Sequence, residues 1–145
     1  MATVCPCGRT DARGRALALA DCCGPVLAGE PAADAEALMR SRYTAFVQGR
    51  VDHLQASWHA RTRPADLTLE PGARWLGLEV RGHWRTGPET AEVEFVARFR
   101  VGGRAVRQHE RSRFVCEQGR WFYLDGQAPD TAGRSALTSG IALAP

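Results

Sequence analysis

Four cysteines near the N-terminus constrain the fold of this chain more than any other feature. They form two close pairs, Cys5-Pro6-Cys7 and the vicinal Cys22-Cys23. In a reducing compartment disulfides are disfavoured, and clustered cysteine pairs are typical of metal ligands. Zinc takes four thiolates in a tetrahedron at about 2.3 Å, which leaves no coordination position open. We therefore predict that Cys5, Cys7, Cys22 and Cys23 bind one structural Zn²⁺.

The vicinal pair also predicts a local conformation. In an extended strand Cys22 and Cys23 would point to opposite faces, whereas on a helical turn they diverge by about 100° and can reach one metal. We therefore expect a turn at this point. The connecting segment contains Arg9, Arg13 and Arg15, which could offset the negative charge of four thiolates around one zinc ion. The alternatives for these cysteines are unmetallated thiols, a redox pair and a different metal, such as an iron–sulfur site.

Length and charge limit the classes of protein to which the chain can belong. Its 145 residues, 44% of them hydrophobic, indicate one main domain with a small appendage. The formal net charge of +3 is too small to indicate a nucleic-acid partner. No apolar run approaches the roughly 18 residues of a membrane helix. The apolar run Ala16–Ala20 is shorter than the roughly 7–15 residues of a signal sequence, so we expect a cytoplasmic protein.

Three helices are predicted in the first half of the chain. Asp34 can cap a helix whose apolar positions recur at helical spacing until Gly49. The sequence Asp52-x-x-Gln55 has the pattern of a capping box and predicts a second helix. Pro64 suits the first turn of a brief third helix, which Pro71-Gly72 would close.

From residue 75 onward the pattern changes to the alternation that is typical of strands. Strands are expected over residues 75–84, 91–101, 106–117 and 121–124, with a hairpin turn at Gly102-Gly103. Helices followed by a meander predict an α+β fold, in which the helices pack on one face of a curved antiparallel sheet. The small, polar residues from Gln127 onward predict a loosely ordered tail.

Alternation in the last two strands places polar and aromatic side chains where they could line a pocket. His109, Arg111 and Arg113 share one face of the third strand, and Tyr123 and Asp125 share one side of the fourth. If the protein binds a small anionic ligand, we predict that these five residues contact it, because arginine offers a planar donor fork. The competing interpretation is a solvated face whose arginines are neutralised by carboxylates within the fold. The sequence shows no acid–base pair, and we predict no catalytic residue.

Several longer strings stand out when they are taken together. They are Cys5-Pro-Cys-Gly8, Cys22-Cys23, Leu38-Met-Arg-Ser-Arg-Tyr-Thr-Ala-Phe46, Trp58-His59, Trp75-Leu-Gly-Leu78, Val93-Glu-Phe-Val-Ala-Arg-Phe99, His109-Glu-Arg-Ser-Arg-Phe114 and Gly119-Arg-Trp-Phe-Tyr-Leu-Asp-Gly126. In this order, over residues 5–126, they closely resemble the YchJ family of small, uncharacterised bacterial proteins.

The resemblance implies an architecture of two parts and a tail. Residues 1–30 would form a SEC-C zinc motif, like the one that ends the translocase ATPase SecA, with the four cysteines as ligands. Residues 31–128 would form a nuclear transport factor 2-like, or cystatin-like, cone, and residues 129–145 the loose tail. The spacing between Cys7 and Cys22 is longer than in the compact motif and is filled by Arg-Thr-Asp-Ala-Arg-Gly-Arg instead of Ser-Gly-x-Lys. A longer loop costs little closure entropy, so the zinc prediction stands.

The family supplies no known activity, so two functional hypotheses follow. The favoured one is a non-catalytic binding or adaptor protein, whose zinc knuckle contacts a protein or ribosomal partner and whose cone stabilises the chain or forms a homodimer. The alternative is an enzyme or a small-ligand-binding protein that uses the cavity of the cone, by analogy with the fold alone. A deep pocket that contains His109, Arg111 or Asp125 would favour the second hypothesis.

Overall fold

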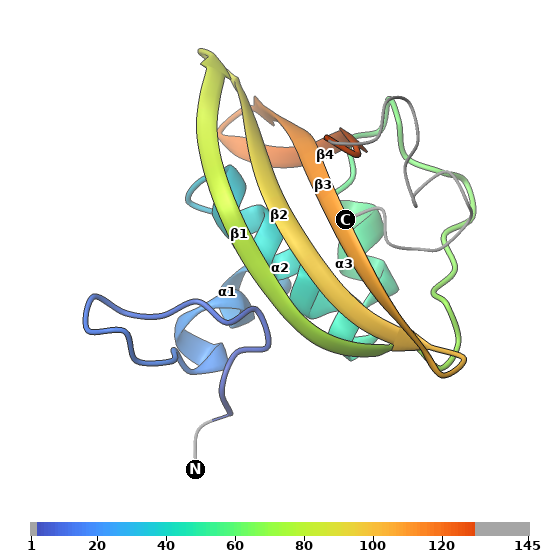
Figure 1. Cartoon of the computed structure of the whole chain (residues 1–145). Coiled ribbons are helices and arrows are strands. Elements are labelled where there is room, and N and C mark those ends of the chain that lie inside the picture. The colour runs from blue at the N-terminus through green and yellow to red at the C-terminus, as the bar shows by residue number, and fades with distance from the viewer. Residues whose placement is uncertain (1–2, 130–145) are drawn as a thin grey trace.

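The computed structural model describes residues 3–129, in which short helices precede an antiparallel sheet (Figure 1). This order confirms the predicted α+β class. All but the first residue of the tail expected over 129–145 lie outside the described residues. The elements are η1 (Leu19–Asp21), α1 (Cys23–Leu27), α2 (Ala35–Gln48), α3 (Val51–Ala56), β1 (Arg74–Gly87), β2 (Thr90–Val101), β3 (Arg104–Glu117) and β4 (Arg120–Gln127).

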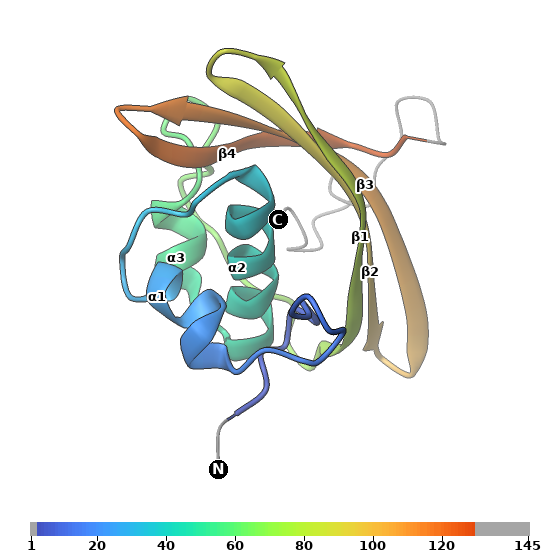
Figure 2. The same ribbon diagram turned by 90° about the vertical axis from the view of Figure 1, so that its left-hand side faces the viewer.

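The sheet is a simple meander with the strand order β1-β2-β3-β4, and each neighbouring pair is antiparallel. It curves around α2, so that α1, α2 and α3 lie on its concave side (Figure 2). Gly102 and Gly103 have φ angles of 56° and 78° and form the predicted hairpin turn. Register irregularities in the β1–β2 and β3–β4 pairs allow these strands to bend. The sheet therefore has an inward face, toward the helices, and an outward face.

Helix α2 has the predicted start and end. The Asp34 side chain accepts a hydrogen bond from the Ala37 backbone N–H at 2.8 Å, and Gly49 ends the helix with a φ of 71°. The helix is buried on most sides, and its buried residues include the polar Arg42 and Thr44 as well as apolar ones. The polar side chains of α2 therefore enter the interior of the molecule.

The second predicted helix is present as α3, without the expected cap, and the third is not found. In α3 the N-cap is Arg50, whose side chain pairs with Asp52 at 2.9 Å, so the expected capping box does not form. No helix lies within residues 61–73. In this segment the Thr62 hydroxyl donates to the Leu124 carbonyl at 2.6 Å, and the Arg63 side chain donates to the Trp58 carbonyl. These side-chain bonds hold the segment against β4 in an irregular conformation.

The hydrophobic core lies between the inward face of the sheet and the helices. On β2 it is formed by Val93, Phe95 and Phe99, each with an exposed fraction of 0%. Val93 and Phe95 belong to one cluster of buried residues that also contains Cys5, Cys7, Cys23 and Leu27, so packing is continuous across the boundary expected at residues 30 and 31. Within residues 3–129, no helix is both long enough and apolar enough to cross a membrane.

Candidate functional site

The two cysteine pairs meet beside α2. The Sγ atoms of Cys5, Cys7, Cys22 and Cys23 all lie within 4.8 Å of one another, as the sequence predicts. The Cys5–Cys7 and Cys7–Cys22 sulfur distances are 3.6 and 3.5 Å. Cys5, Cys7 and Cys23 are buried, and Cys22 is half-buried.

The local backbone explains how each pair reaches the cluster. Gly8 has a φ of 79° and its N–H donates to the Cys5 carbonyl at 3.3 Å, which folds the first pair into a tight turn. The second pair lies where η1 ends and α1 begins, so the predicted turn is present. A Cβ atom on Gly24 would come within 2.8 Å of the Leu19 carbonyl oxygen, which favours glycine directly after the second pair.

The geometry of the cluster fits a metal ion with four thiolate ligands. Sulfurs placed about 2.3 Å from a central ion in a tetrahedron are about 3.8 Å apart, close to the observed distances. Burial, with the charge of Cys7, raises the pKa of Cys22 to about 12, and the neighbouring sulfurs also raise the pKa of Cys23. A bound cation would counteract these increases in pKa, because it stabilises the deprotonated sulfurs.

Helix α2 supplies two side chains to the cluster that were not identified from the sequence. The Thr44 hydroxyl lies 3.7 Å from the Cys5 sulfur. Arg40 donates to the Cys7 carbonyl at 3.0 Å and lies 3.9 Å from the Cys7 sulfur. A guanidinium and a hydroxyl in these positions favour negative charge on the sulfurs. No local signal identifies them, because they are distant from the cysteines in sequence.

Two arginines of the connecting segment, Arg9 and Arg15, pair with carboxylates. Arg15 pairs with Asp11 at 3.2 Å at the surface. Arg9 lies 3.9 Å from Glu36, which also pairs with Arg40 at 2.8 Å. Arg40 is therefore the cation in direct contact with the cluster, and Glu36 links it to the knuckle segment.

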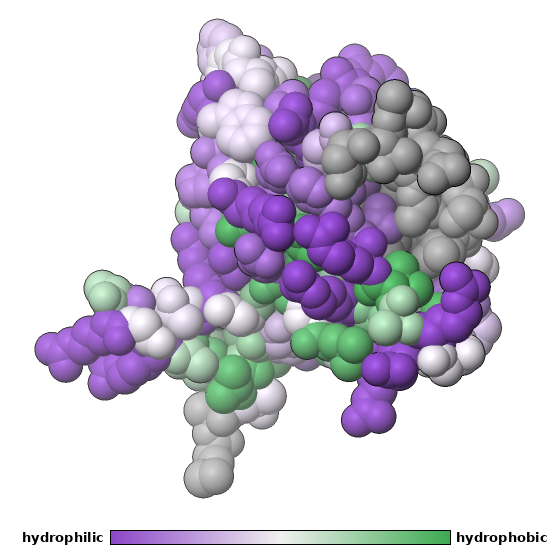
Figure 3. Space-filling model, viewed as in Figure 1, coloured by the Kyte–Doolittle hydropathy of each residue, from purple (hydrophilic) through white to green (hydrophobic). Residues whose placement is uncertain are grey.

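The polar residues predicted for a ligand site are placed on both faces of the sheet. On the outward face, His109 and Arg111 pair with Glu94 at 2.7 and 3.5 Å, and Arg113 pairs with Asp125 at 2.6 Å through its Nε atom. The outward residues therefore form a ladder of paired charges. This is the arrangement expected if carboxylates within the fold neutralise the arginines. The surface over this face is mainly hydrophilic (Figure 3).

Tyr123 lies on the inward face instead, with an exposed fraction of 1%. The bulge between Arg113 and Phe114 changes the pairing along β4, so that Phe114 pairs with Tyr123 and Arg113 with Asp125. The inward face of β3 also carries Gln108, which was not singled out from the sequence. Phe114, two and four residues beyond Ser112 and Glu110, is buried on the same face, but one apolar residue among polar ones does not by itself identify an interior face.

Comparison with known sequences relates this chain to the YchJ and UPF0225 proteins. The family described as "YchJ, middle NTF2-like domain" matches residues 34–126. A UPF0225 protein from Polaromonas sp. is 60% identical over 126 residues, which cover 84% of this chain and 91% of the relative. A UPF0225 protein from Methylibium petroleiphilum is 61% identical over 132 residues, which cover 89% and 92%.

Two solved structures show the same architecture. The solution structure of a SEC-C motif containing protein from Rhodopseudomonas palustris is 36% identical, has a TM-score of 0.74 and covers 88% of this chain and all of its own. The crystal structure of a SEC-C motif containing protein from Psychrobacter arcticus is 29% identical, has a TM-score of 0.70 and covers 90% of this chain and 84% of its own. The predicted nuclear transport factor 2-like fold is confirmed.

Proposed function

This chain belongs to the YchJ/UPF0225 family, and from that premise we propose that it is a non-catalytic binding or adaptor protein with a structural zinc ion in its four-cysteine cluster. The observation that carries the proposal is the convergence of four sulfurs within 4.8 Å. An all-thiolate tetrahedral site is typical of structural zinc. A reducing compartment such as the cytoplasm keeps the thiols available to the metal.

The zinc assignment is tested by elemental analysis of protein purified without a chelator. We expect about one zinc per chain, and we expect the Cys22→Ser variant to lose most of it because one of four ligands is removed. Cys116→Ser is the matched control, since Cys116 lies outside the cluster and should leave the zinc content unchanged. Metal-free protein whose four clustered thiols react under native conditions would contradict the proposal.

The adaptor role is supported by the shape and exposure of the knuckle. The loop that is closed by the bridge between Thr10 and Ala16 projects away from the helices and the sheet (Figure 1). Val4 has an exposed fraction of 59%, and the Arg15 side chain one of 68%. A metal ion bound by the four cysteines would hold this segment rigid. Its exposed valine and arginines would then form a surface that suits a protein or ribosomal partner.

Affinity capture from the native host tests this role. We expect that the zinc-loaded chain retains a partner, and that the chelated chain and the Arg13→Glu variant lose it. Arg104→Glu, at the exposed turn between β2 and β3, is the matched control and should retain the same partner. Equal capture by the Arg13→Glu and Arg104→Glu variants would exclude the knuckle loop as the contact surface.

A further inference from the structure

The inward face of β3 is polar where the core around it is apolar. Gln108, Glu110 and Ser112 occupy consecutive inward positions and have exposed fractions of 2%, 0% and 0%. On the neighbouring β2 the paired inward residues are Ala97, Phe95 and Val93. Burying three polar side chains against apolar partners is unfavourable unless something satisfies their hydrogen-bonding groups.

Several polar atoms of this inward row, defined as Gln108, Glu110 and Ser112, have no partner. Gln108 donates through Nε2 to Glu110 Oε1 at 3.2 Å. Within residues 3–129, the buried atoms without a hydrogen bond include Gln108 Oε1, Glu110 Oε2 and Ser112 Oγ of the row, and Trp58 Nε1, whose ring packs against that of Tyr123. Unsatisfied buried groups are rare in folded proteins, and a concentration of them on one surface indicates an occupant.

The sequence makes room for the Glu110 carboxyl group. Gly126 pairs with Ser112 across the β3–β4 ladder. A Cβ atom on Gly126 would lie 1.5 Å from Glu110 Oε2 and 2.5 Å from its Cδ. The carboxyl group therefore occupies the space that any larger residue at position 126 would fill.

Aromatic and cationic side chains complete the surroundings of the inward row. The Arg42 guanidinium is fully buried and lies 4.5 Å from the centre of the Tyr123 ring and 5.1 Å from that of Trp58. Tyr123 is within electrostatic range of both ionisable groups: burial and Glu110 raise its pKa, while Arg42 acts to lower it. Arg42, Trp58, Glu110 and Tyr123 come from four separate strings of the sequence that carry the family resemblance.

Three of these four unpartnered atoms can donate a hydrogen bond, whereas Gln108 Oε1 is an acceptor. Burial raises the pKa of Glu110 to about 8, so its carboxyl group is protonated at neutral pH. Because Oε1 accepts from Gln108, the proton is on Oε2, which is then a donor. Glu110 Oε2–H, Ser112 Oγ–H and Trp58 Nε1–H are therefore three buried donors, whereas the Arg42 guanidinium already donates to the Leu54 carbonyl and to Ser57 Oγ. Such a set is complementary to the oxygens of a carboxylate.

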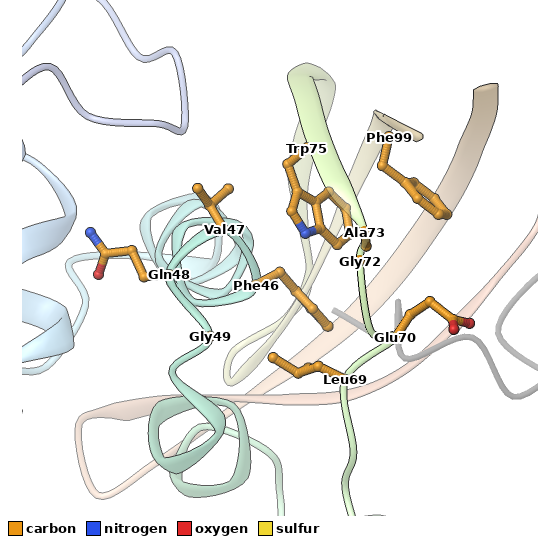
Figure 4. A pocket seen from close by; sticks show the side chains of 10 residues that line it. All are labelled: Phe46, Val47, Gln48, Gly49, Leu69, Glu70, Gly72, Ala73, Trp75 and Phe99. Atoms are coloured by element: carbon orange, nitrogen blue, oxygen red, sulfur yellow. The ribbon is translucent and has the colours of Figure 1, made fainter. Parts of the chain in front are cut away.

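We propose that the inward row of β3, with Trp58, is a binding site for a small carboxylate. A cavity of about 310 Å³ lies between the end of α2 and the start of β1, lined by Phe46, Leu69, Trp75 and Phe99 among others (Figure 4). Phe99 pairs with Val106, and this inward pair is next to the Ala97–Gln108 pair in the β2–β3 ladder. In this proposal the carboxylate enters from this cavity, which lies one inward pair away from Gln108.

The test uses acetate and benzoate as probes on the full, metal-loaded chain. Titration calorimetry and thermal unfolding should show that at least one carboxylate binds and raises the Tm, while benzylammonium and chloride at equal ionic strength do not. Ser112→Ala should weaken the binding about three- to tenfold, the effect of one hydrogen bond, and leave the Tm without ligand unchanged or higher. Trp58→Phe, which removes only the indole donor, should weaken it similarly.

The outward face supplies the control. Arg113→Ala removes a paired surface arginine and should leave carboxylate affinity unchanged. If Arg113→Ala abolishes binding and Ser112→Ala does not, the site is on the outward face and the proposal is wrong. If neither carboxylate binds, or benzylammonium binds equally well, the assignment of the ligand class is overturned.

Discussion

On the outward face of β3, His109, Arg111 and Arg113 are paired with carboxylates, whereas on the inward face Glu110 and Ser112 are buried with unpartnered atoms. The register explains the contrast. Outward, Arg111 is opposite Glu94 and Arg113 is opposite Asp125, so each arginine meets an acid. Inward, Glu110 is opposite Phe95 and Ser112 is opposite Gly126, which offer no side-chain partner. Charges on one face are paired within the fold, whereas several polar atoms on the other have no hydrogen-bond partner among residues 3–129.

The largest expected effect comes from filling the space above Gly126. We predict that Gly126→Ala lowers the free energy of unfolding by about 1–3 kcal/mol, because the new methyl group must displace the buried Glu110 carboxyl group. Chemical denaturation measures the loss. Gly77→Ala, a strand glycine with nothing within 4 Å of its Cβ position, is the matched control and should cost little. A loss in Gly126→Ala that persists when Glu110 is also changed to Ser would show that another clash is responsible.

The second effect is a dependence of stability on pH that belongs to Glu110. The unfolded chain releases this proton near 4.5, the ordinary pKa of a glutamate side chain, and the folded chain holds it to about 8. Stability attributable to Glu110 is therefore greatest below pH 4.5 and falls as the pH rises to about 8. Below pH 6.5 His53, whose pKa burial lowers to about 4, has the opposite influence, so the window from about pH 6.5 to 8 is the informative one.

Melting temperatures of the wild-type chain and the Glu110→Gln variant across this window measure the difference. Glu110→Gln should remove the decline, because an amide does not titrate. Glu94→Gln should leave the decline in place, since hydrogen bonding to His109 keeps the pKa of Glu94 below its usual range. Identical profiles for the wild-type chain and Glu110→Gln would show that Glu110 is already ionised at the lower end of the window.

A smaller effect is expected for Glu94, which joins His109 and Arg111 on the outward face. The His109 and Glu94 side chains have exposed fractions of 13% and 22%, so water screens their contact only in part. We predict a loss of about 0.5–1.5 kcal/mol for Glu94→Gln at neutral pH. Because the folded-state pKa of Glu94 is lowered, the difference from the wild-type chain should disappear as the pH falls through that pKa. A difference that persists at low pH would indicate a packing effect.

The smallest effect is expected for Arg113, whose partner Asp125 is also exposed at the surface. The two side chains have exposed fractions of 53% and 42%. Arg113→Ala should cost about 0.2–1 kcal/mol, and the loss should shrink in about 1 M NaCl because salt screens the pair. Urea denaturation at low and high salt measures both values. A loss as large as that of Gly126→Ala would mean that the two faces contribute equally.

Part of the candidate metal centre was predictable from short-range spacing. The two pairs at Cys5 and Cys7 and at Cys22 and Cys23 predict a common site, and the structure groups their sulfurs within 4.8 Å. The contacts of Arg40 and Thr44 with this cluster were not predictable. They depend on how α2 packs against a segment more than thirty residues earlier in the chain, and no local pattern reports such a distance.

The sequence by itself determined the class of the fold, the limits of α2 and the grouping of the cysteines. Each of these depends on local chemistry, such as the cap at Asp34, the left-handed conformation of Gly49 and the alternation of the strands. Only the tertiary structure decided which face of β3 is the interior. Alternation divides His109 from Glu110, but burial depends on which side the helices cover, and pairing depends on the residues opposite in β2 and β4. For that reason the sequence predicted a site at the outward cations, whereas the structure shows unpartnered polar atoms on the inward row.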